Sequence, residues 1–358
     1  MGTYGDSSAP SYNTTYFDSV FSLSVENFQR ELIDAIGASN SFLHKMRQSD
    51  FYESVPGGEF ASAPLMYALA EADSYEGYDE LSTLPTDGIT KALYDWRQIS
   101  APIAYNLKEV IQNRNGIKDL VKARILQCEL GLEEYFSSSL FRGNGDGYLS
   151  TPKTSTRNGS LGPEPFGKLI ADDPTATATV GNIPQQTYTW WQNYTADSTA
   201  TKYYQLLFEL DHGYNTCSLG TGGPPDLMPL DQTSYELVVH ALYTKYQQVG
   251  SNNEFPFENT KFKRALLVME DKVPDYYSNL TSTATYGTVL FINTKFFRVK
   301  YINDRNFVML TDENGKVFQK PIGGDSRVGN MAWMGQVCCN NRRKQGVLAK
   351  IARTLTVT

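Results

Sequence analysis

The chain has 358 residues, of which 41% are hydrophobic, 13% are aromatic and only 20% are charged. A chain of this length can bury a substantial core, and its hydrophobic content excludes a disordered protein. The formal net charge is 32 − 39 = −7, and the densest basic run is Arg342-Arg343-Lys344. Proteins that hold nucleic acid tightly need a larger basic patch, so tight DNA binding is not expected. A mildly acidic wall beside DNA is compatible with this charge, because such a wall repels phosphate.

Thiols and imidazoles are too few and too scattered to indicate a metal centre. The chain has three histidines and four cysteines, Cys128, Cys217, Cys338 and Cys339, with no C-x-x-C spacing. A structural zinc site and a cofactor are therefore not expected. Cys338 and Cys339 would point to opposite faces of a strand, which favours reduced structural thiols over a bridge. Neither an export signal nor an apolar run of about 18 residues is present, so no membrane association is expected.

The first third of the chain predicts an arm followed by a long extended excursion. Residues 1 to about 23 are expected to be flexible, and Ser24 then caps a short helix that ends at Gly37. Gly57-Gly58 opens an extended run to Leu69, and a second run goes from Ile89 through Trp96 to Ile103. A polar tip with Tyr75 and Tyr78 lies between them. An isolated hairpin is marginally stable, so it needs another surface, unless it packs on its own domain as an ordinary insertion.

The strongest predicted helix covers about residues 116–141. Asn115 is its expected cap, and Gly143 follows its end. A helix of this length spans on the order of 35 to 40 Å, enough to act as the spine of a domain. Its expected core face consists of Ile117, Leu120, Val121, Leu132, Tyr135 and Phe136.

The remainder predicts a loop, a mixed section and a strand-rich end, which gives an α+β protein. Residues 143–162 are rich in Gly, Ser, Thr and Asn, and their GNGDGY run lacks the spaced acids of a calcium loop. Thr233 and Glu236 form a capping box before a helix. The predicted strands that follow are ALLVME, TVLFINTKFFRV, NFVML, MAWMGQVCCN and GVLAKIARTLTV.

No motif indicates catalysis, so an enzyme is not expected. G-x-S-x-G, G-x-x-x-x-G-K-[ST] and H-E-x-x-H are all missing from the sequence. Acidic pairs usually face solvent, and a surface loop is the simplest place for a lone histidine. The aromatic cluster could stack on sugars or unpaired bases, but core or interface packing is the commoner fate. The groups considered were Glu133-Glu134, Asp172-Asp173, Asp211-His212, the Gly220 turn, and Trp190-Trp191 with Tyr188 and Tyr194.

The order of these segments resembles the major capsid proteins of tailed bacteriophages with the Hong Kong 97-like fold. The similar runs are GGEFASAPLMYALAEADSYEGYDEL, IADDPTATATVGNIPQQTYTWWQNY, DLMPLDQTSYELVVHAL, ALLVMEDKVP, FINTKFF and GQVCCNNRRKQGVL. They cover nearly everything from about residue 25. The resemblance implies an N-arm at 1–48, an E-loop at 49–108, the spine helix of the peripheral (P) domain at 109–145, an axial (A) domain at 146–255, and return strands of both domains at 256–358.

The resemblance implies a structural protein that assembles as hexamers and pentamers into an icosahedral head in the host cytoplasm, as part of the virion. Double-stranded DNA would be enclosed without tight binding, and the other expected partners are a separate scaffolding protein, a portal and decoration proteins. Gly57 and Gly58 would be E-loop hinges or merely shape a turn. Tyr75, Tyr78, Trp96, Arg342 and Arg343 would contact neighbouring subunits, although a solvated basic turn explains the arginines as well. Some members link Lys to Asn covalently, but no such set can be assigned here beyond the presence of Lys91 in the E-loop.

Three other classes stay open from the residues. An encapsulin-like nanocompartment shell would share the fold. A secreted β-rich carbohydrate-binding protein or glycosidase would need an export signal and an acidic, aromatic cleft. A phage tail or decoration protein would not need the long spine helix.

Overall fold

The computed structural model divides into two compact units. The smaller unit consists of Met1–Ala38, Ser100–Glu133 and Phe307–Ala332, and the larger of Ser39–Ile99, Glu134–Asn306 and Trp333–Thr358. Within these, the structure describes residues 52–70, 72–78, 87–106, 108–109, 117–144, 152–156, 159–243, 260–273, 286–310, 317–320 and 324–356. The helix predicted after Ser24 and most of the GNGDGY run lie outside the described residues.

A six-stranded sheet forms the centre of the larger unit. Its strand order is β7-β15-β11-β8-β10-β9, with parallel β8–β10 and β7–β15 pairs and an antiparallel β11–β15 pair. Consecutive residues of β11, such as Leu290 and Phe291, are both fully buried, which is the pattern of a strand covered on both faces. The bounds are β7 Tyr194–Asp197, β8 Leu227–Leu230, β9 Lys261–Phe262, β10 Ala265–Met269, β11 Tyr286–Phe291 and β15 Gly346–Ala352.

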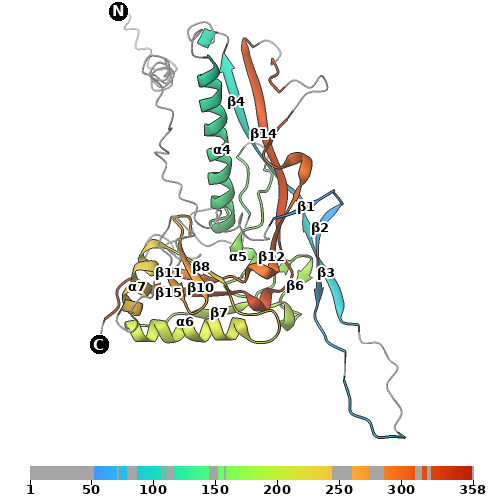
Figure 1. Ribbon diagram of the computed structural model, residues 1–358, viewed down its shortest axis with the longest axis vertical. Helices are drawn as coiled ribbons and strands as arrows, with labels where there is room; N and C mark the ends of the chain where they lie inside the picture. Colours follow the sequence, from blue (N-terminus) through green and yellow to red (C-terminus); the bar gives the residue numbers. More distant parts are fainter. Residues whose placement is uncertain are drawn as a thin grey trace, which may run out of the picture. The chain divides into compact units, whose positions relative to one another are not determined.

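Two helices pack on this sheet, α6 (Tyr203–Ser218) and α7 (Gln232–Tyr243), as Figure 1 shows. The buried residues of each helix are apolar and recur at helical spacing. Each helix therefore packs its apolar side on the sheet and exposes its opposite side to solvent. The shared core includes Leu206, Leu210, Tyr214, Leu237, Val238, Met228, Leu230, Val289, Phe291 and Leu348.

The start of α7 differs from the sequence prediction. The helix begins at Gln232, and the carboxylate of Asp231 accepts the backbone N–H of Ser234 at 3.1 Å. Asp231 is almost fully buried and also pairs with Arg353 near the end of the chain. The predicted cap at Thr233 is therefore wrong. Asp231, two residues earlier, caps the helix, and its ion pair with Arg353 holds its carboxylate in place.

A second sheet contains β1 (Tyr52–Val55), β4 (Arg97–Asn106), β12 (Phe297–Ile302), β13 (Val308–Met309) and β14 (Ser326–Cys339). In the larger unit β1 lies parallel to β12, and β12 is antiparallel to the end of β14. In the smaller unit β13 pairs with Met331 and Ala332 of β14. β4 also pairs with β14. Strands are present in each predicted strand segment of the C-terminal section, but the predicted run TVLFINTKFFRV is divided by a single-turn helix into β11 and β12, which belong to different sheets, and the last predicted run is a strand only as far as Ala352. The shorter elements are α5 (Phe166–Leu169), β5 (Thr179–Val180), β6 (Ile183–Pro184), and the single-turn helices η1 (Thr189–Trp191), η2 (Thr294–Phe296), η3 (Asn303–Arg305) and η4 (Arg342–Lys344).

The predicted spine helix is α4 (Ile117–Phe141), whose 25 residues belong to both units. Leu132 and Phe136 are buried and Tyr135 is partly buried, as the predicted core face requires. Phe136 meets Trp333 edge-on at 4.9 Å between ring centroids, which fixes the end of the helix inside the larger unit. The side chains of the other predicted core positions, Ile117, Leu120 and Val121, lie outside the described residues. Among the helices that the structure describes, none has the length and apolarity that a bilayer crossing requires.

Candidate functional site

The β2–β3 hairpin is formed by β2 (Phe60–Met66) and β3 (Ile89–Asp95), which lie side by side (Figure 1). Successive side chains of a strand point to opposite faces, so the hairpin has two different surfaces. One face is buried, with the directly paired Ala63 and Ala92 at its centre and Leu65 and Tyr94 beside them. The other face carries exposed apolar side chains, among them the cross-strand neighbours Met66 and Ile89, which are 67% and 73% exposed.

The buried face rests on the chain's own larger unit. The hydroxyl of Tyr94 donates to the carbonyl of Cys339 at 2.9 Å, and burial raises the pKa of this tyrosine well above its usual value. The backbone N–H of Leu93 donates to the carbonyl of Gly181 at 2.9 Å. Gly181 has a φ of +59°, and a Cβ there would lie 2.7 Å from the Cβ of Ala92. A glycine at position 181 is therefore required by the close approach between the hairpin and the turn before β6.

The first residues of the hairpin are fixed as well. Gly57 and Gly58 have φ values of +138° and +139°, a region that residues with a side chain rarely adopt. The indole N–H of Trp96 donates to the carbonyl of Gly58 at 2.8 Å, and the ammonium of Lys300 donates to the carbonyl of Ser62 at 2.9 Å. Trp96, which the sequence suggested as a contact to a neighbour, thus has an intrachain partner and is partly buried. By contrast, Tyr75 and Tyr78 are exposed, and their contacts to a neighbour stay predictions.

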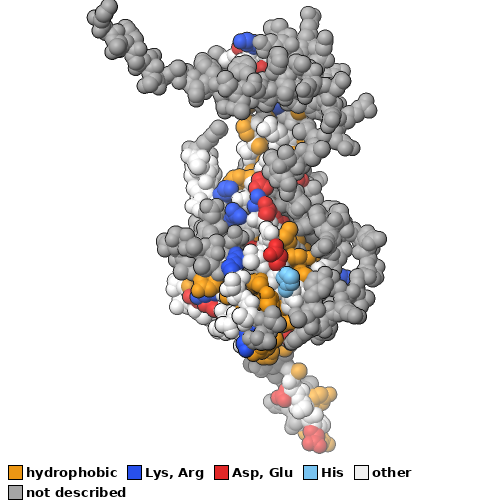
Figure 2. Space-filling model, turned by 90° about the vertical axis from the view of Figure 1, so that its left-hand side faces the viewer, with side chains coloured by type: hydrophobic (Ala, Val, Ile, Leu, Met, Phe, Trp, Pro, Cys, Tyr) orange, Lys and Arg blue, Asp and Glu red, His pale blue; other side chains and the backbone are white. Residues whose placement is uncertain are grey.

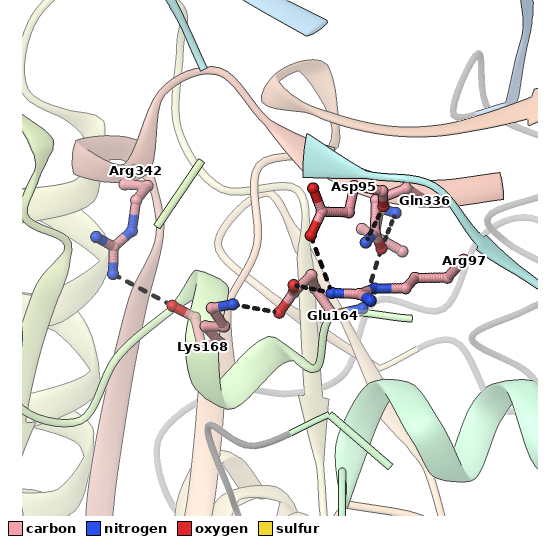
Figure 3. A network of polar contacts seen from close by, with 7 residues as sticks. Asp95, Arg97, Glu164, Lys168, Gln336 and Arg342 are labelled. Atoms are coloured by element: carbon pink, nitrogen blue, oxygen red, sulfur yellow. Dashed lines mark hydrogen bonds and ion pairs between the residues drawn. The ribbon is translucent and has the colours of Figure 1, made fainter. Parts of the chain in front are cut away.

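A polar network continues from the root of the hairpin into the larger unit (Figure 3). The carboxylate of Glu164 is nearly buried and pairs with Lys168 at 2.8 Å and with Arg97 at 3.6 Å. The side-chain amide of Gln336 accepts the backbone N–H of Glu164 at 3.0 Å and donates to the carbonyl of Asp95 at 2.9 Å. The end of β3, the start of β4, α5 and β14 are thereby held together by charged and amide groups that compensate one another.

Arg342 corrects a sequence prediction. We expected its guanidinium at a subunit surface, but it is fully buried inside its own chain. It donates to the carbonyls of Leu169 at 2.7 Å and Trp191 at 3.0 Å, and to the side-chain oxygens of Gln185 and Asn193, both at 3.0 Å. A planar fork of five N–H groups suits this ring of neutral acceptors, because each donor can reach a different segment. A contact of Arg342 with a neighbouring subunit is therefore excluded.

The other two cations of this basic run have different positions. The ammonium of Lys344 is nearly buried and donates to the carbonyls of Ser218, Leu219 and Gly220 at 3.3, 2.6 and 3.2 Å. It satisfies carbonyls at the end of α6, where a positive charge also complements the helix dipole. Arg343 is exposed, and its contact with a neighbour stays a prediction. The sequence carries no signal for this division, since three consecutive cations look alike until the turn of η4 is known.

The structure also places the remaining candidates. Trp191 is buried, and its indole N–H donates to the carbonyl of Val180 at 3.0 Å, so it belongs to the core. Asp211 and His212 lie in α6 rather than in the predicted loop, with His212 exposed. Among the described residues, no group of three His, Cys, Asp or Glu side chains could hold a metal ion. All four cysteines are free and buried.

Charges are mixed on the face of the molecule that Figure 2 displays. Figure 2 shows Lys, Arg, Asp and Glu side chains interspersed with hydrophobic ones on the face that it displays. The exposed apolar side chains of the hairpin are therefore the clearest candidate for a functional surface among the described residues.

Comparisons with known proteins found similar solved structures but no matching sequence. No protein-family model and no curated protein match the chain. A chain from the capsid asymmetric unit of cyanophage A-1(L) matches with a TM-score of 0.64 at 12% identity, over 84% of this chain and 90% of that one. The chain has the Hong Kong 97-like capsid fold. A second match to this fold is the SrpI encapsulin of Synechococcus elongatus PCC 7942, with a TM-score of 0.54 at 10% identity, over 95% of this chain and 97% of that one.

Proposed function

We propose that the chain is a structural subunit of a closed icosahedral shell, the major capsid protein of a tailed bacteriophage, with no catalytic role. The observation that carries this proposal is the two-faced β2–β3 hairpin. One face is anchored in the subunit through Tyr94, while the other exposes Met66, Ile89 and part of Phe60. A monomer gains nothing from a paired apolar strip that stays in water.

The exposed face of the hairpin would lie on a neighbouring subunit, in the role of the E-loop. Burying Met66 and Ile89 would contribute about 1.5–3 kcal/mol each from the removal of apolar surface from water. One such contact is weak, but a closed shell repeats it in every subunit, so the contacts add up through multivalency. Shell subunits with this fold are structural proteins, which agrees with a chain whose sequence has no catalytic motif.

The remaining parts of the proposal follow from the same assignment. The net charge of −7 suits a shell wall that encloses double-stranded DNA without binding it tightly. Hexamers and pentamers would be the building units, and a scaffolding protein, a portal and decoration proteins would be the other partners. Tyr75, Tyr78 and Arg343, which are exposed, are further candidates for contacts between subunits.

An encapsulin-like nanocompartment shell is a second candidate. It is favoured by the match that covers 95% of this chain and 97% of the encapsulin. The contents of the particle separate the two functions. Particles isolated from the native source would contain double-stranded DNA if the chain is a phage capsid protein, and protein cargo if it is an encapsulin.

The test is assembly of the isolated chain, alone and with a crowding agent, followed by sedimentation velocity and electron microscopy. We expect closed particles or rings far heavier than the 40.1 kDa subunit. The double variant Met66→Ser, Ile89→Ser should stay folded and lose assembly. Leu219→Ser is the matched control, because Leu219 is also 73% exposed but lies outside the hairpin. A subunit that stays monomeric under all conditions, including addition of the lysate of an infected host, would contradict the proposal.

A further inference from the structure

Helix α6 carries large side chains on two opposite sides. On one side, Leu206 and Leu210 are fully buried in the core that the helix shares with the sheet. On the other side, Tyr204, Phe208 and His212 are exposed. Both series recur every four residues, and the two are offset by two residues, which is about 200° around the helix. The exposed series, called the α6 patch below, therefore faces away from the sheet, which lies on one side of α6 in Figure 1.

The α6 patch is unusually apolar for the solvent side of a helix. Tyr204 is 49% exposed and Phe208 is 72% exposed. With about 150–250 Å² for a whole aromatic side chain, the two rings leave on the order of 250 Å² in water. The neighbouring helix α7 has Gln232, Glu236 and His240 exposed at the same four-residue spacing, which is the polar side that a helix packed on a sheet normally has. The difference between the two helices indicates that another surface covers the α6 patch.

The charged groups that border the α6 patch are engaged within the chain. At one end, Lys263 pairs with Asp211, and its ammonium also donates to the side-chain oxygen of Asn215 at 2.8 Å. The amide of Asn215 donates to the carboxylate of Asp211 at 3.1 Å, which completes a neutral polar border. At the other end, the ammonium of Lys202 lies 5.9 Å from the centroid of the Tyr204 ring.

This arrangement decides which kind of partner fits. A nucleic acid is held through Lys and Arg side chains that are free to meet phosphates, and an anionic membrane surface needs such side chains as well. An apolar row with a neutral polar border suits another folded protein, whose own apolar side chains would displace water from the rings.

The area that a subunit has to bury identifies this protein as a second copy of the chain. A standard interface removes about 800 Å² from each partner. On the outer face of the hairpin, Phe60, Met66 and Ile89 are 40%, 67% and 73% exposed. Even if each of them had the area of an aromatic side chain, they would supply only on the order of 350 Å². A neighbour in a closed shell therefore needs a further contact, and the α6 patch supplies apolar area of the same order.

We propose that the α6 patch is a contact surface for a second copy of the chain, with Phe208 at its centre. Subunits of a ring meet head to tail, so the patch would lie against a different surface of the neighbour and not against a second α6 patch. This inference rests on the proposed function, because the second copy is a neighbouring subunit of the shell. It adds a contact that does not involve the hairpin.

The first test measures whether the patch is covered. His212→Cys keeps both rings and introduces a thiol within the patch, and all four native cysteines are buried. Leu219→Cys is the matched control, because Leu219 is 73% exposed but lies beyond the end of α6. In assembled particles the thiol at position 212 should react with N-ethylmaleimide at least about ten times more slowly than in the free subunit, and the control should change by less than about twofold. Equal reaction at position 212 in both forms would overturn the inference and leave the shell function intact.

The second test needs no particles. Sedimentation equilibrium measures the association constant of the subunit with itself, which the double variant Tyr204→Ser, Phe208→Ser should lower at least about tenfold, because two rings lose their burial. Leu219→Ser should leave the constant unchanged within about twofold. Thermal unfolding checks that the double variant is folded, and Phe208→Gln, which keeps a good helix former, replaces it otherwise. A folded variant that associates as strongly as the wild type would contradict the contact.

The results separate this inference from the proposed function. Small oligomers that depend on the patch but never close into particles would refute the shell function and support the contact. Particles that assemble from the double variant at the wild-type rate would refute the contact. Protection of position 212 that requires a protein from the lysate of an infected host, and not a second copy, would also overturn the inference, because the occupant would then be an accessory protein.

Discussion

The guanidinium of Arg342 lies over the indole of Trp191, with 5.8 Å between its carbon and the ring centroid, and also donates to the Trp191 backbone carbonyl at 3.0 Å. One side chain thus contacts both the ring and the backbone of a residue about 150 positions earlier. With the carbonyl of Leu169 and the amide of Asn193, it draws α5, η1 and the start of β7 around the turn η4. Because these acceptors come from separate segments of the chain, loss of the one side chain should loosen all of them together.

Replacing Arg342 by Ala should lower the free energy of unfolding by more than about 3 kcal/mol, since several buried acceptors lose their donor at once. Arg342→Lys should recover only part of this, because an ammonium cannot reach acceptors spread over a planar fork. Urea unfolding of the unassembled subunit, followed by tryptophan fluorescence, measures both. The neighbour Arg343 provides the control: it is exposed, and Arg343→Ala should change the free energy by no more than about 0.5 kcal/mol. Equal effects at the two positions would contradict the assignment.

A side chain at Gly57 or Gly58 should lower the free energy of unfolding, whether or not these residues act as a hinge. Gly57→Ala should cost about 1–3 kcal/mol, because the backbone there has a φ of +138° although the space around it is open. Gly77→Ala is the matched control, since its surroundings are equally open and its φ is not in that region. Because an added Cβ meets no atom within 4 Å at either position, a difference between the two variants in thermal unfolding measures backbone strain. If both alanines are tolerated equally, the glycines do not constrain the hairpin root.

The architecture was largely predictable from the sequence, whereas the connections across it were not. Hydrophobic periodicity and glycine or polar ends are local signals, so the spine helix, the hairpin strands and the C-terminal strands could be located. The positions of Arg342 and Lys344 depend on carbonyls that come from residues more than 120 positions away, and no local pattern encodes such a partner. The same holds for Asp231, the cap of α7, because its carboxylate is held by an ion pair with the distant Arg353. The stack of Tyr67 on Trp190, with 4.8 Å between the ring centroids, could not be foreseen either, because it joins the excursion to the turn η1 of the central section.

The buried thiols should make the subunit sensitive to alkaline pH. Burial raises the pKa of Cys217, Cys338 and Cys339 to about 12 each, while an unfolded thiol titrates near pH 8.5. Because the folded pKa is raised, this contribution to stability is complete below about pH 8.5 and is lost as the pH rises toward 12. Each thiol should remove up to about 1.4 kcal/mol per pH unit within that window. Unfolding free energies at pH 8, 9 and 9.5 should therefore fall, and Cys217→Ala should flatten the slope; a slope unchanged by this variant would show that the thiols are not responsible.

The same burial predicts chemically inert cysteines. A thiol reagent such as dithiobis(nitrobenzoate) attacks the thiolate, which the high pKa of these groups suppresses at pH 8. Native subunits should release no colour within the time in which guanidinium-unfolded subunits react at all four cysteines. Fast reaction of a native thiol would place it at the surface and would contradict the packing of the element that carries it, which is α4 for Cys128, α6 for Cys217 and β14 for Cys338 and Cys339.

The hydrogen bond of Tyr94, which anchors the root of the hairpin, can be tested by removing a single oxygen atom. Tyr94→Phe keeps the ring against Gly181 but removes the hydroxyl that donates to the buried carbonyl of Cys339. We expect a loss of about 1–3 kcal/mol in unfolding free energy, since that acceptor is left without this donor. Tyr188→Phe, at a ring that is 42% exposed, is the control and should stay within about 0.5 kcal/mol of the wild type. If the shell assignment is right, Tyr94→Phe should also slow assembly, because a loosened root no longer presents Met66 and Ile89 at a fixed angle. A variant that loses stability but assembles at the wild-type rate would mean that the neighbour, rather than Tyr94, sets the position of the hairpin.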